Sequence, residues 1–435
     1  MKREDSSFRK IHLGGLNIKR RIALALALAI CLTLVCSVAL ADKVTVNFFH
    51  RWPNEPKNSY INGLIEEFEA ANPDIDIVSD CVLNDSYKEK IRVLVSTDDL
   101  PDVFFSWSGA FGENLTKSGR VLPLDDVLAA DPEWASQIVE SQWAPFNYSG
   151  KQYGTPWSMD GKAFFYNVDA FNELGLAVPT TLSELYAVCE TLKENGYDEP
   201  ISAGFSAQWA VSHYLGTICQ RVVDPEVLAN DYMNGGDFSD PGYITALNIF
   251  KELGQYMTAD PCSVDHEFAR NAFIMEVSPI CYMQLAEIKY LRDDAEFEYS
   301  FFNFPAVEDG KGDPGQLTGA PEGMMISATA EPAVQEAAIK FMKFVISKEG
   351  GYNLIAKTGE ISCVKGAWDE TNCDAKQLEA IDLILASTQP AVWQDCATDA
   401  TIANAFMAGG QLLLTGDMTA EDVMASVQTA AAALK

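Results

Sequence analysis

The chain has 435 residues, of which 48% are apolar and 11% aromatic, and it carries 62 acidic against 31 basic side chains. This length predicts about two to four domains, each able to bury a core of its own, and the apolar fraction excludes an intrinsically disordered chain. The net charge of −31 excludes nucleic acid as the main partner, because a site for a polyanion needs a basic face.

The first residues have the pattern of an export signal. Seven Lys and Arg and only two acidic residues within residues 1–21 precede an apolar run over Ile22–Leu40, and Ala39-Leu40-Ala41 offers the small residues that a signal peptidase requires. We therefore expect residues 1–41 to be a signal peptide cleaved after Ala41, and the protein to be periplasmic or extracellular. A permanent anchor is the alternative, because a transmembrane helix needs about 20 apolar residues.

The exported chain, residues 42–435, is still more acidic and keeps eight cysteines. Its net charge becomes −36 once the seven basic and two acidic residues of the signal peptide are removed. An even number of cysteines outside the cytoplasm permits disulfides, and Cys363–Cys373 or Cys262–Cys281 would close short loops. No CxxC pair and no Cys/His cluster occurs, so we expect no metal, and the cysteine pairing stays open.

Strand-like and helix-like segments alternate along the first hundred residues of the exported chain. This order predicts a parallel sheet covered by helices. Because ligands bind at the carboxyl ends of such strands, the loops at Arg51–Asn58 and Ser106–Gly112 are candidate site loops. The predicted segments are a strand at Val44–Phe49, a helical face at Ile61–Phe68, a strand at Ile75–Val78, a helix at Tyr87–Val95 and a strand at Asp102–Phe105.

The rest of the chain is richer in helices. No internal repeat is present, which argues against a structural or adhesion protein. Periodicity predicts helices at 182–195, 243–257, 267–275, 331–347, 376–387, 398–414 and 419–434, and strands at 280–283, 299–304 and 324–327.

Motifs of catalysis are missing from the sequence. It contains no HExxH, GxSxG or GxxxxGK[ST], and His50, His213 and His266 are not spaced as metal ligands. The GxGxxG match at residues 310–315 contains Pro314, which favours a hairpin loop over a phosphate cradle. We therefore expect no enzyme. Paired carboxylates for glycoside hydrolysis occur by chance in so acidic a chain.

Several tryptophans stand in predicted loops beside polar residues, among them Trp52, Trp107, Trp157 and Trp393. A sugar offers apolar C–H faces that stack on an indole and hydroxyl groups that need acceptors. Tryptophan together with carboxylate is therefore typical of a carbohydrate site. For any single tryptophan, packing at the edge of the core is the alternative.

Several motifs occur in a collinear order over the whole exported chain. They are Leu100–Phe105, Gly119–Leu124, Gly150–Trp157 with Phe164–Asn167 and Phe171–Leu176 after it, Ala338–Phe344, and Thr358–Ile361. In this order they resemble the bacterial extracellular solute-binding proteins of ABC importers, in the sugar-binding group that includes maltose-binding protein.

The resemblance implies an α/β, two-lobed periplasmic-binding-protein fold with a hinge that the chain crosses three times and a ligand cleft between the lobes. Lobe 1 would comprise residues 42–157 and 318–357, and lobe 2 residues 158–317 and the helical residues 358–435. The implied function is that of an extracytoplasmic substrate-binding protein. It would capture a carbohydrate, an oligosaccharide, by lobe closure and deliver it to the permease subunits in the membrane, as a monomer without a cofactor.

The resemblance also assigns ligand contacts by position. Asp160 falls where the maltose binder has a sugar-binding acidic residue, four positions after the shared Pro156. Relatives often carry Gly-x-Trp after a Met-containing strand, where this chain has Tyr282–Glu287, so Glu287 is expected to supply a polar contact instead. The full set of expected contacts is Trp52, Glu55, Trp107, Ser108, Trp157, Asp160, Trp209, Glu287, Glu322 and Trp393.

Two alternatives to a sugar receptor follow from the same residues. A non-sugar solute such as a polyamine would also suit an acidic cleft. A secreted glycan-cleaving enzyme would use tryptophan and carboxylate as well, and turnover of an oligosaccharide would reveal it.

Overall fold

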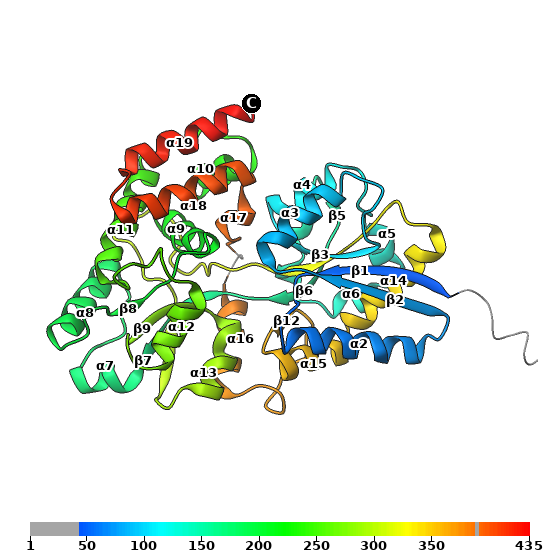
Figure 1. Cartoon of the computed structure of the whole chain (residues 1–435), viewed down its shortest axis with the longest axis horizontal. Helices are drawn as coiled ribbons and strands as arrows, with labels where there is room; N and C mark the ends of the chain where they lie inside the picture. Colours follow the sequence, from blue (N-terminus) through cyan, green and yellow to red (C-terminus); the bar gives the residue numbers. More distant parts are fainter. Residues whose placement is uncertain (1–42, 388–390) are drawn as a thin grey trace, which may run out of the picture.

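The computed structural model describes residues 43–387 and 391–435 and shows two lobes, each built around a sheet of its own (Figure 1). The two-lobed α/β fold expected from the sequence is confirmed. The predicted signal peptide, residues 1–41, lies outside the described residues. No helix within the described ranges is long and apolar enough to cross a membrane.

The first lobe, which holds the blue strands in Figure 1, contains a six-stranded sheet. β1 pairs in parallel with β2 and with β3, as the alternation of strands and helices predicts. The sheet as a whole is mixed, because β11 pairs antiparallel with both β3 and β6. The strand order is β12 (Ile361–Ser362), β6 (Thr155–Met159), β11 (Glu322–Ile326), β3 (Val103–Trp107), β1 (Val44–His50) and β2 (Ile75–Cys81).

Amphipathic helices cover this sheet. On α2, Tyr60, Ile61, Leu64 and Phe68 recur at helical spacing and are all buried. The Phe68 ring packs edge-on against Phe341 of α14, with centroids 5.1 Å apart. The helices of this part are α2 (Lys57–Ala71), α3 (Asn84–Leu94), α4 (Ala110–Thr116), α5 (Asp125–Ala130), α6 (Pro132–Ser136), α14 (Pro332–Val345) and α15 (Lys348–Thr358), with the short turns η1 (Glu140–Gln142) and η2 (Ala144–Phe146) and the hairpin β4 (Asn147–Tyr148) and β5 (Lys151–Gln152).

The second lobe contains a four-stranded sheet in the order β10 (Tyr299–Phe302), β7 (Lys162–Asn167), β9 (Ile280–Gln284) and β8 (Ile201–Ser202). In Figure 1 the last two helices of the chain, drawn in orange and red, lie on the green helices of this lobe. Its helices are α7 (Val168–Leu174), α8 (Leu182–Glu194), α9 (Trp209–Val222), α10 (Pro225–Met233), α11 (Gly242–Leu253), α12 (His266–Ile274), α13 (Ile288–Asp294), α16 (Ala375–Ala386), α17 (Gln394–Ala397), α18 (Ala400–Thr415) and α19 (Ala420–Ala433), with the turns η3 (Gly254–Tyr256) and η4 (Leu285–Glu287).

Most predicted helices agree with the structure to within a few residues, because caps mark their ends. A capping box of Thr181 and Glu184 starts α8, and one of Thr419 and Asp422 starts α19. The exception is α11, which ends at Leu253 and continues as a 3₁₀ turn, so the helix predicted to Met257 is too long.

The two lobes are joined where β6 of the first sheet is followed directly by β7 of the second. Asp160 and Gly161 form this connection, and a Cβ on Gly161 would lie 2.2 Å from Leu317. The lobe boundaries expected above stay a prediction. We note that β12, beyond residue 358, pairs with β6 in the six-stranded sheet.

Candidate functional site

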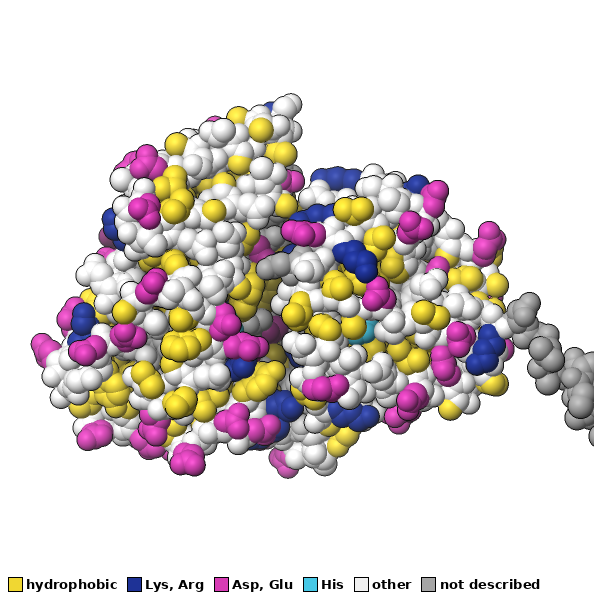
Figure 2. Space-filling view, viewed as in Figure 1, with side chains coloured by type: hydrophobic (Ala, Val, Ile, Leu, Met, Phe, Trp, Pro, Cys, Tyr) yellow, Lys and Arg dark blue, Asp and Glu magenta, His cyan; other side chains and the backbone are white. Residues whose placement is uncertain are grey.

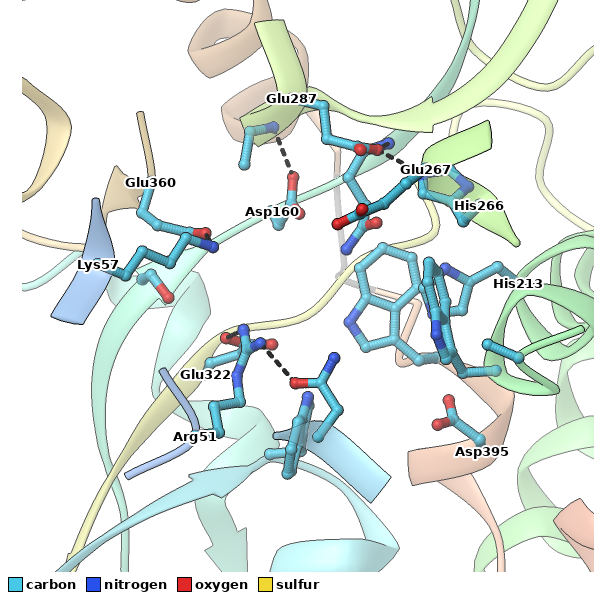
Figure 3. A pocket seen from close by; sticks show the side chains of 18 of the residues that line it. Arg51, Lys57, Asp160, His213, His266, Glu267, Glu287, Glu322, Glu360 and Asp395 are labelled. Carbon is cyan, nitrogen blue, oxygen red and sulfur yellow. Dashed lines mark hydrogen bonds and ion pairs between the residues drawn. The ribbon is translucent and has the colours of Figure 1, made fainter. Parts of the chain in front are cut away.

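A cavity of about 370 Å³ lies between the two lobes. Figure 2 shows the surface indented where the lobes meet, and Figure 3 shows side chains from both lobes pointing into the cavity. Its volume is within the range of small-molecule sites, roughly 300–1,000 Å³.

One wall comes from the first lobe, at the carboxyl ends of its parallel strands. Arg51 follows β1, Lys57 begins α2 and Trp107 ends β3, and all three line the cavity. Asn84 and Lys88 reach it from α3. Both loops selected from the sequence as candidate site loops therefore supply lining residues, as expected for the carboxyl edge of a parallel sheet.

The opposite wall comes from the second lobe. α9 contributes Trp209 and His213, four residues apart and so on one helical face. α12, whose N-cap Asp265 accepts a hydrogen bond from the Phe268 N–H at 2.8 Å, contributes His266 and Arg270 in the same way. The remaining lining residues of this wall include Glu267, Gln284, Glu287, Tyr290, Trp393 and Asp395.

Aromatic rings form one patch of the second wall. The His213 imidazole is stacked on the Trp393 indole, with ring centroids 4.1 Å apart and planes 16° apart. Trp209 meets His213 and His266 edge-on, at 4.9 and 5.1 Å. Trp107 lies across the cavity on the first lobe. The rings offer flat apolar surfaces with polar edges.

Each Lys and Arg that lines the cavity is paired with a carboxylate that also lines it. Lys88 Nζ lies 2.6 Å from Asp395 Oδ2, and Arg270 Nη1 lies 2.8 Å from Glu287 Oε1. The two other pairs are Arg51 with Glu322 and Lys57 with Glu360, shown in Figure 3. Net charge within each pair is close to zero, while donors and acceptors remain for a ligand.

Glu287 is the most strongly held carboxylate of the cavity. It accepts hydrogen bonds from His266 Nε2 at 2.7 Å, Arg270 Nη1 at 2.8 Å and the Gln284 N–H at 3.1 Å. Although burial opposes ionisation, the charges of His266 and Arg270 hold the pKa of Glu287 below its ordinary value. Glu287 is therefore an ionised anchor that fixes α12 against the strand end.

Asp160 behaves in the opposite way. Its Oδ1 accepts the Gly161 N–H at 2.8 Å and the Ala286 N–H at 3.2 Å. Burial, then the negative charges of Glu360 and Glu322, raise the pKa of Asp160 well above its ordinary value. A protonated carboxyl can donate as well as accept a hydrogen bond, which suits a ligand rich in hydroxyl groups.

We expect Asp160→Asn to stabilise the ligand-free protein at neutral pH. Because the folded-state pKa is raised, Asp160 costs stability as the pH rises from its ordinary pKa of 3.8 toward the folded value. Asparagine carries no such cost, and its carbonyl can accept the same two N–H groups. Urea unfolding at pH 7 and pH 3 should show the gain only at pH 7, with the exposed Asp382→Asn unchanged at both. An equal gain at both pH values would contradict the raised pKa.

Residues 52–352 match the family of bacterial extracellular solute-binding proteins. The chain belongs to this family. Membership indicates an exported protein.

This solute-binding protein is similar to the Multiple sugar-binding protein of Streptococcus mutans serotype c, which is 25% identical over 374 residues, 81% of this chain and 82% of the relative. Among solved structures, a chitin oligosaccharide binding protein has a TM-score of 0.81 at 20% identity and covers 90% of this chain and 99% of its own. A protein from work on xylan utilization by Caldanaerobius polysaccharolyticus has a TM-score of 0.80 at 22% identity, with 89% and 99% covered. The two structures share the fold.

The structure brings together six of the ten expected contact residues. On the wall of the cavity lie Trp107, Asp160, Trp209, Glu287, Glu322 and Trp393. Of these, Glu287 and Glu322 are also engaged in ion pairs. That the six contact a ligand stays a prediction.

The other four expected contacts do not line the cavity. Trp52 and Trp157 are 3% and 1% exposed and pack against each other in the core, with ring centroids 4.7 Å apart. Ser108 is buried, with 1% of its surface exposed. Glu55 is exposed and accepts the Ser59 N–H at the start of α2, at 3.3 Å. The structure thus places the two tryptophans in the core, and a ligand contact for any of these four residues stays a prediction.

Several lining residues were not expected. Arg51 and Lys57 lie within a loop that the sequence had selected, but only its tryptophan and glutamate were named. The sequence does carry a signal for His213, which lies four residues after Trp209 and so on the same helix face. The same spacing places Arg270 on one face with His266. The ion pairs of Glu360 and Asp395 have no local signal, because their partners are 303 and 307 residues away.

Cys396 lines the cavity, but within the described residues the cysteines form neither a disulfide nor part of a metal site. The eight cysteines of the described residues are free, six of them buried. Within the same residues no group of three or more His, Cys, Asp and Glu side chains is arranged to hold a metal ion. Residues 310–315 form a loop, with Gly310 packed against the Arg221 carbonyl.

Proposed function

We propose that this solute-binding protein captures an oligosaccharide between its lobes and delivers it to the membrane permease of an ABC importer. The observation that carries the proposal is the combination, in one cavity, of aromatic faces with ion-paired carboxylates. Similarity to a multiple sugar-binding protein and to a chitin oligosaccharide binding protein supports the same ligand class.

The chemistry of the walls favours a neutral polyhydroxylated ligand. Pyranose rings place C–H groups on their faces, which pack on indole rings, and hydroxyl groups at their edges. Those hydroxyls find acceptors in paired carboxylates such as Glu322 and Asp395, and donors in Arg51 and Lys88. An anionic ligand would have to disrupt an existing ion pair, because each Lys and Arg on the walls already has a carboxylate partner.

Lobe closure follows from the way in which the two walls share the cavity. A ligand that contacts Arg51 and Trp107 of the first lobe and Trp209 and Glu267 of the second binds the closed arrangement better than an open one, and so shifts the population toward it. The closed lobes would then present the surface that the permease recognises.

A polyamine is the second candidate ligand, because seven carboxylates line the cavity. Among them, Asp160, Asp265 and Glu267 form no ion pair with any described residue. Four paired cations on the same walls oppose a polycation, so the sugar is favoured.

Isothermal titration of residues 42–435 against a panel of oligosaccharides, monosaccharides and polyamines tests the proposal. We expect micromolar or tighter binding of an oligosaccharide that is recovered intact, with a smaller radius of gyration by X-ray scattering. Heat from a polyamine alone would overturn the ligand class. Hydrolysis of the sugar would overturn the receptor itself.

A further inference from the structure

A lysine is buried directly behind the aromatic patch of the second wall. Lys162, the first residue of β7, is 1% exposed, and among the described residues its ammonium forms no ion pair with a carboxylate. Buried lysines normally have such a partner. Instead, Nζ lies 3.2 Å from Nδ1 of His213 and over the rings of Trp209 and Tyr282, 5.2 and 5.3 Å from their centroids.

This contact decides which nitrogen of His213 carries the proton. An ammonium group has three donors and no acceptor, so Nδ1 must present its lone pair to Lys162. In a neutral imidazole the proton then resides on Nε2. Burial, then the charges of Lys162, His266 and Lys88, hold the pKa of His213 well below its ordinary value, which supports the neutral ring.

The Nε2 edge of His213 is available to a ligand. His213 lines the cavity, and Figure 3 shows it on the side of the cavity formed by α9. No hydrogen bond of the described residues engages Nε2, whereas Nδ1 is occupied by Lys162. Stacking on Trp393 at 4.1 Å restrains the tilt of the ring, so the direction of the Nε2–H bond is also restrained.

We propose that Lys162 is a positioning residue that holds His213 in the Nε2–H tautomer, and that His213 thereby donates one hydrogen bond to an oxygen of the bound sugar. The ligand half of this proposal rests on the proposed function; the tautomer half does not. A neutral N–H donor beside a stacking surface selects a hydroxyl, ring or glycosidic oxygen at one position. A ligand without that oxygen would leave the N–H without a partner.

The tautomer is measured directly by long-range ¹H–¹⁵N correlation spectra of the ligand-free protein, with the His213 signals assigned from their loss in His213→Gln. We expect a protonated Nε2 and an unprotonated Nδ1 at pH 7. A protonated Nδ1, an imidazolium or a mixture of tautomers overturns the proposal. If the expected tautomer is present but no sugar binds, the proposed function fails while the role of Lys162 is supported.

Variants test the two residues in the intact protein. Lys162→Met keeps much of the stem but removes the donor, so the His213 tautomers should mix and sugar affinity should fall about ten-fold, the effect of one lost hydrogen bond. Lys343→Met is the matched control, because Lys343 also lies over a tryptophan ring, that of Trp134 at 5.1 Å, outside the cavity. An unchanged tautomer and affinity in Lys162→Met would overturn the proposal.

If Lys162→Met does not fold, substitutions of His213 still test whether this residue donates a hydrogen bond to the sugar. Glutamine can place an N–H donor where Nε2 lies, and leucine cannot. His213→Gln should therefore keep most of the sugar affinity while His213→Leu loses about ten-fold. Equal losses in both variants would show that no hydrogen bond is donated from this position.

Discussion

Trp393→Ala is expected to weaken oligosaccharide binding by about 30-fold or more, the effect of removing a central aromatic contact worth about 2 kcal/mol. Trp393 is 4% exposed, lines the cavity and is stacked on His213. Its removal takes away an apolar face for the sugar and also frees the imidazole ring to tilt. Isothermal titration of wild type and variant against the same sugar measures the loss.

The control for this variant is Trp368→Ala. Trp368 is partly buried. It packs against the hydrophobic core around the six-stranded sheet and does not line the cavity. Truncation of the buried Trp393 should cost about 3–5 kcal/mol of stability, and truncation of the partly buried Trp368 should cost less. Only Trp393→Ala should lose affinity. Trp393→Phe keeps a smaller face and should bind with intermediate affinity. If Trp393→Ala bound the sugar with wild-type affinity, the prediction that Trp393 contacts the ligand would be wrong.

Glu287→Gln is expected to lower the unfolding free energy by about 3 kcal/mol or more at pH 7, because it leaves buried charge without its partner. Arg270 and His266 both bond to this carboxylate, and the Glu287 and Arg270 side chains are 10% and 12% exposed. An amide in the same place removes the negative charge, and in either orientation its N–H₂ group faces at least one N–H donor. Urea unfolding measures the difference.

The pH dependence of that difference identifies its cause. Because the folded-state pKa of Glu287 is lowered, its stabilisation is complete above its ordinary value of 4.5 and is lost as the pH falls through the folded value. The difference between wild type and Glu287→Gln should therefore begin to shrink as the pH falls below 4.5, and it should continue to shrink toward the folded value. Glu296→Gln, at an exposed glutamate, should match wild type throughout. A difference that is independent of pH would point to packing instead of charge.

Local sequence determined the order of elements and one edge of the site. The succession of β1, α2, β2, α3 and β3 is encoded in apolar spacing that any short window reveals. Parallel pairing follows from it, and with that pairing the carboxyl ends of β1 and β3 must face the same side. Arg51, Lys57 and Trp107, which line the cavity, therefore lie in the two segments that the sequence alone predicts to form the site.

Which tryptophan faces the ligand was decided by tertiary structure. Trp157 stands beside Pro156 and Ser158 and reads as a loop residue, but it belongs to a strand that is buried throughout. There Trp52 packs on it, so both indoles are part of the core. Exposure depends on what covers a residue from elsewhere in the chain, and local composition does not contain that information.

The charge of the cavity was likewise decided by contacts across the chain. Arg51 pairs with Glu322 and Lys57 with Glu360, 271 and 303 residues away, and Lys88 meets Asp395 only because α17 reaches the space between the lobes. Gly109 admits α17, since a Cβ there would lie 2.7 Å from the Cys396 carbonyl oxygen. The sequence by itself determined that the chain is acidic and carries the pattern of an export signal. It also predicted two lobes and a ligand site at the carboxyl ends of the strands. Only the folded chain paired the cations with carboxylates, because electrostatic pairing depends on distance in space and not along the chain.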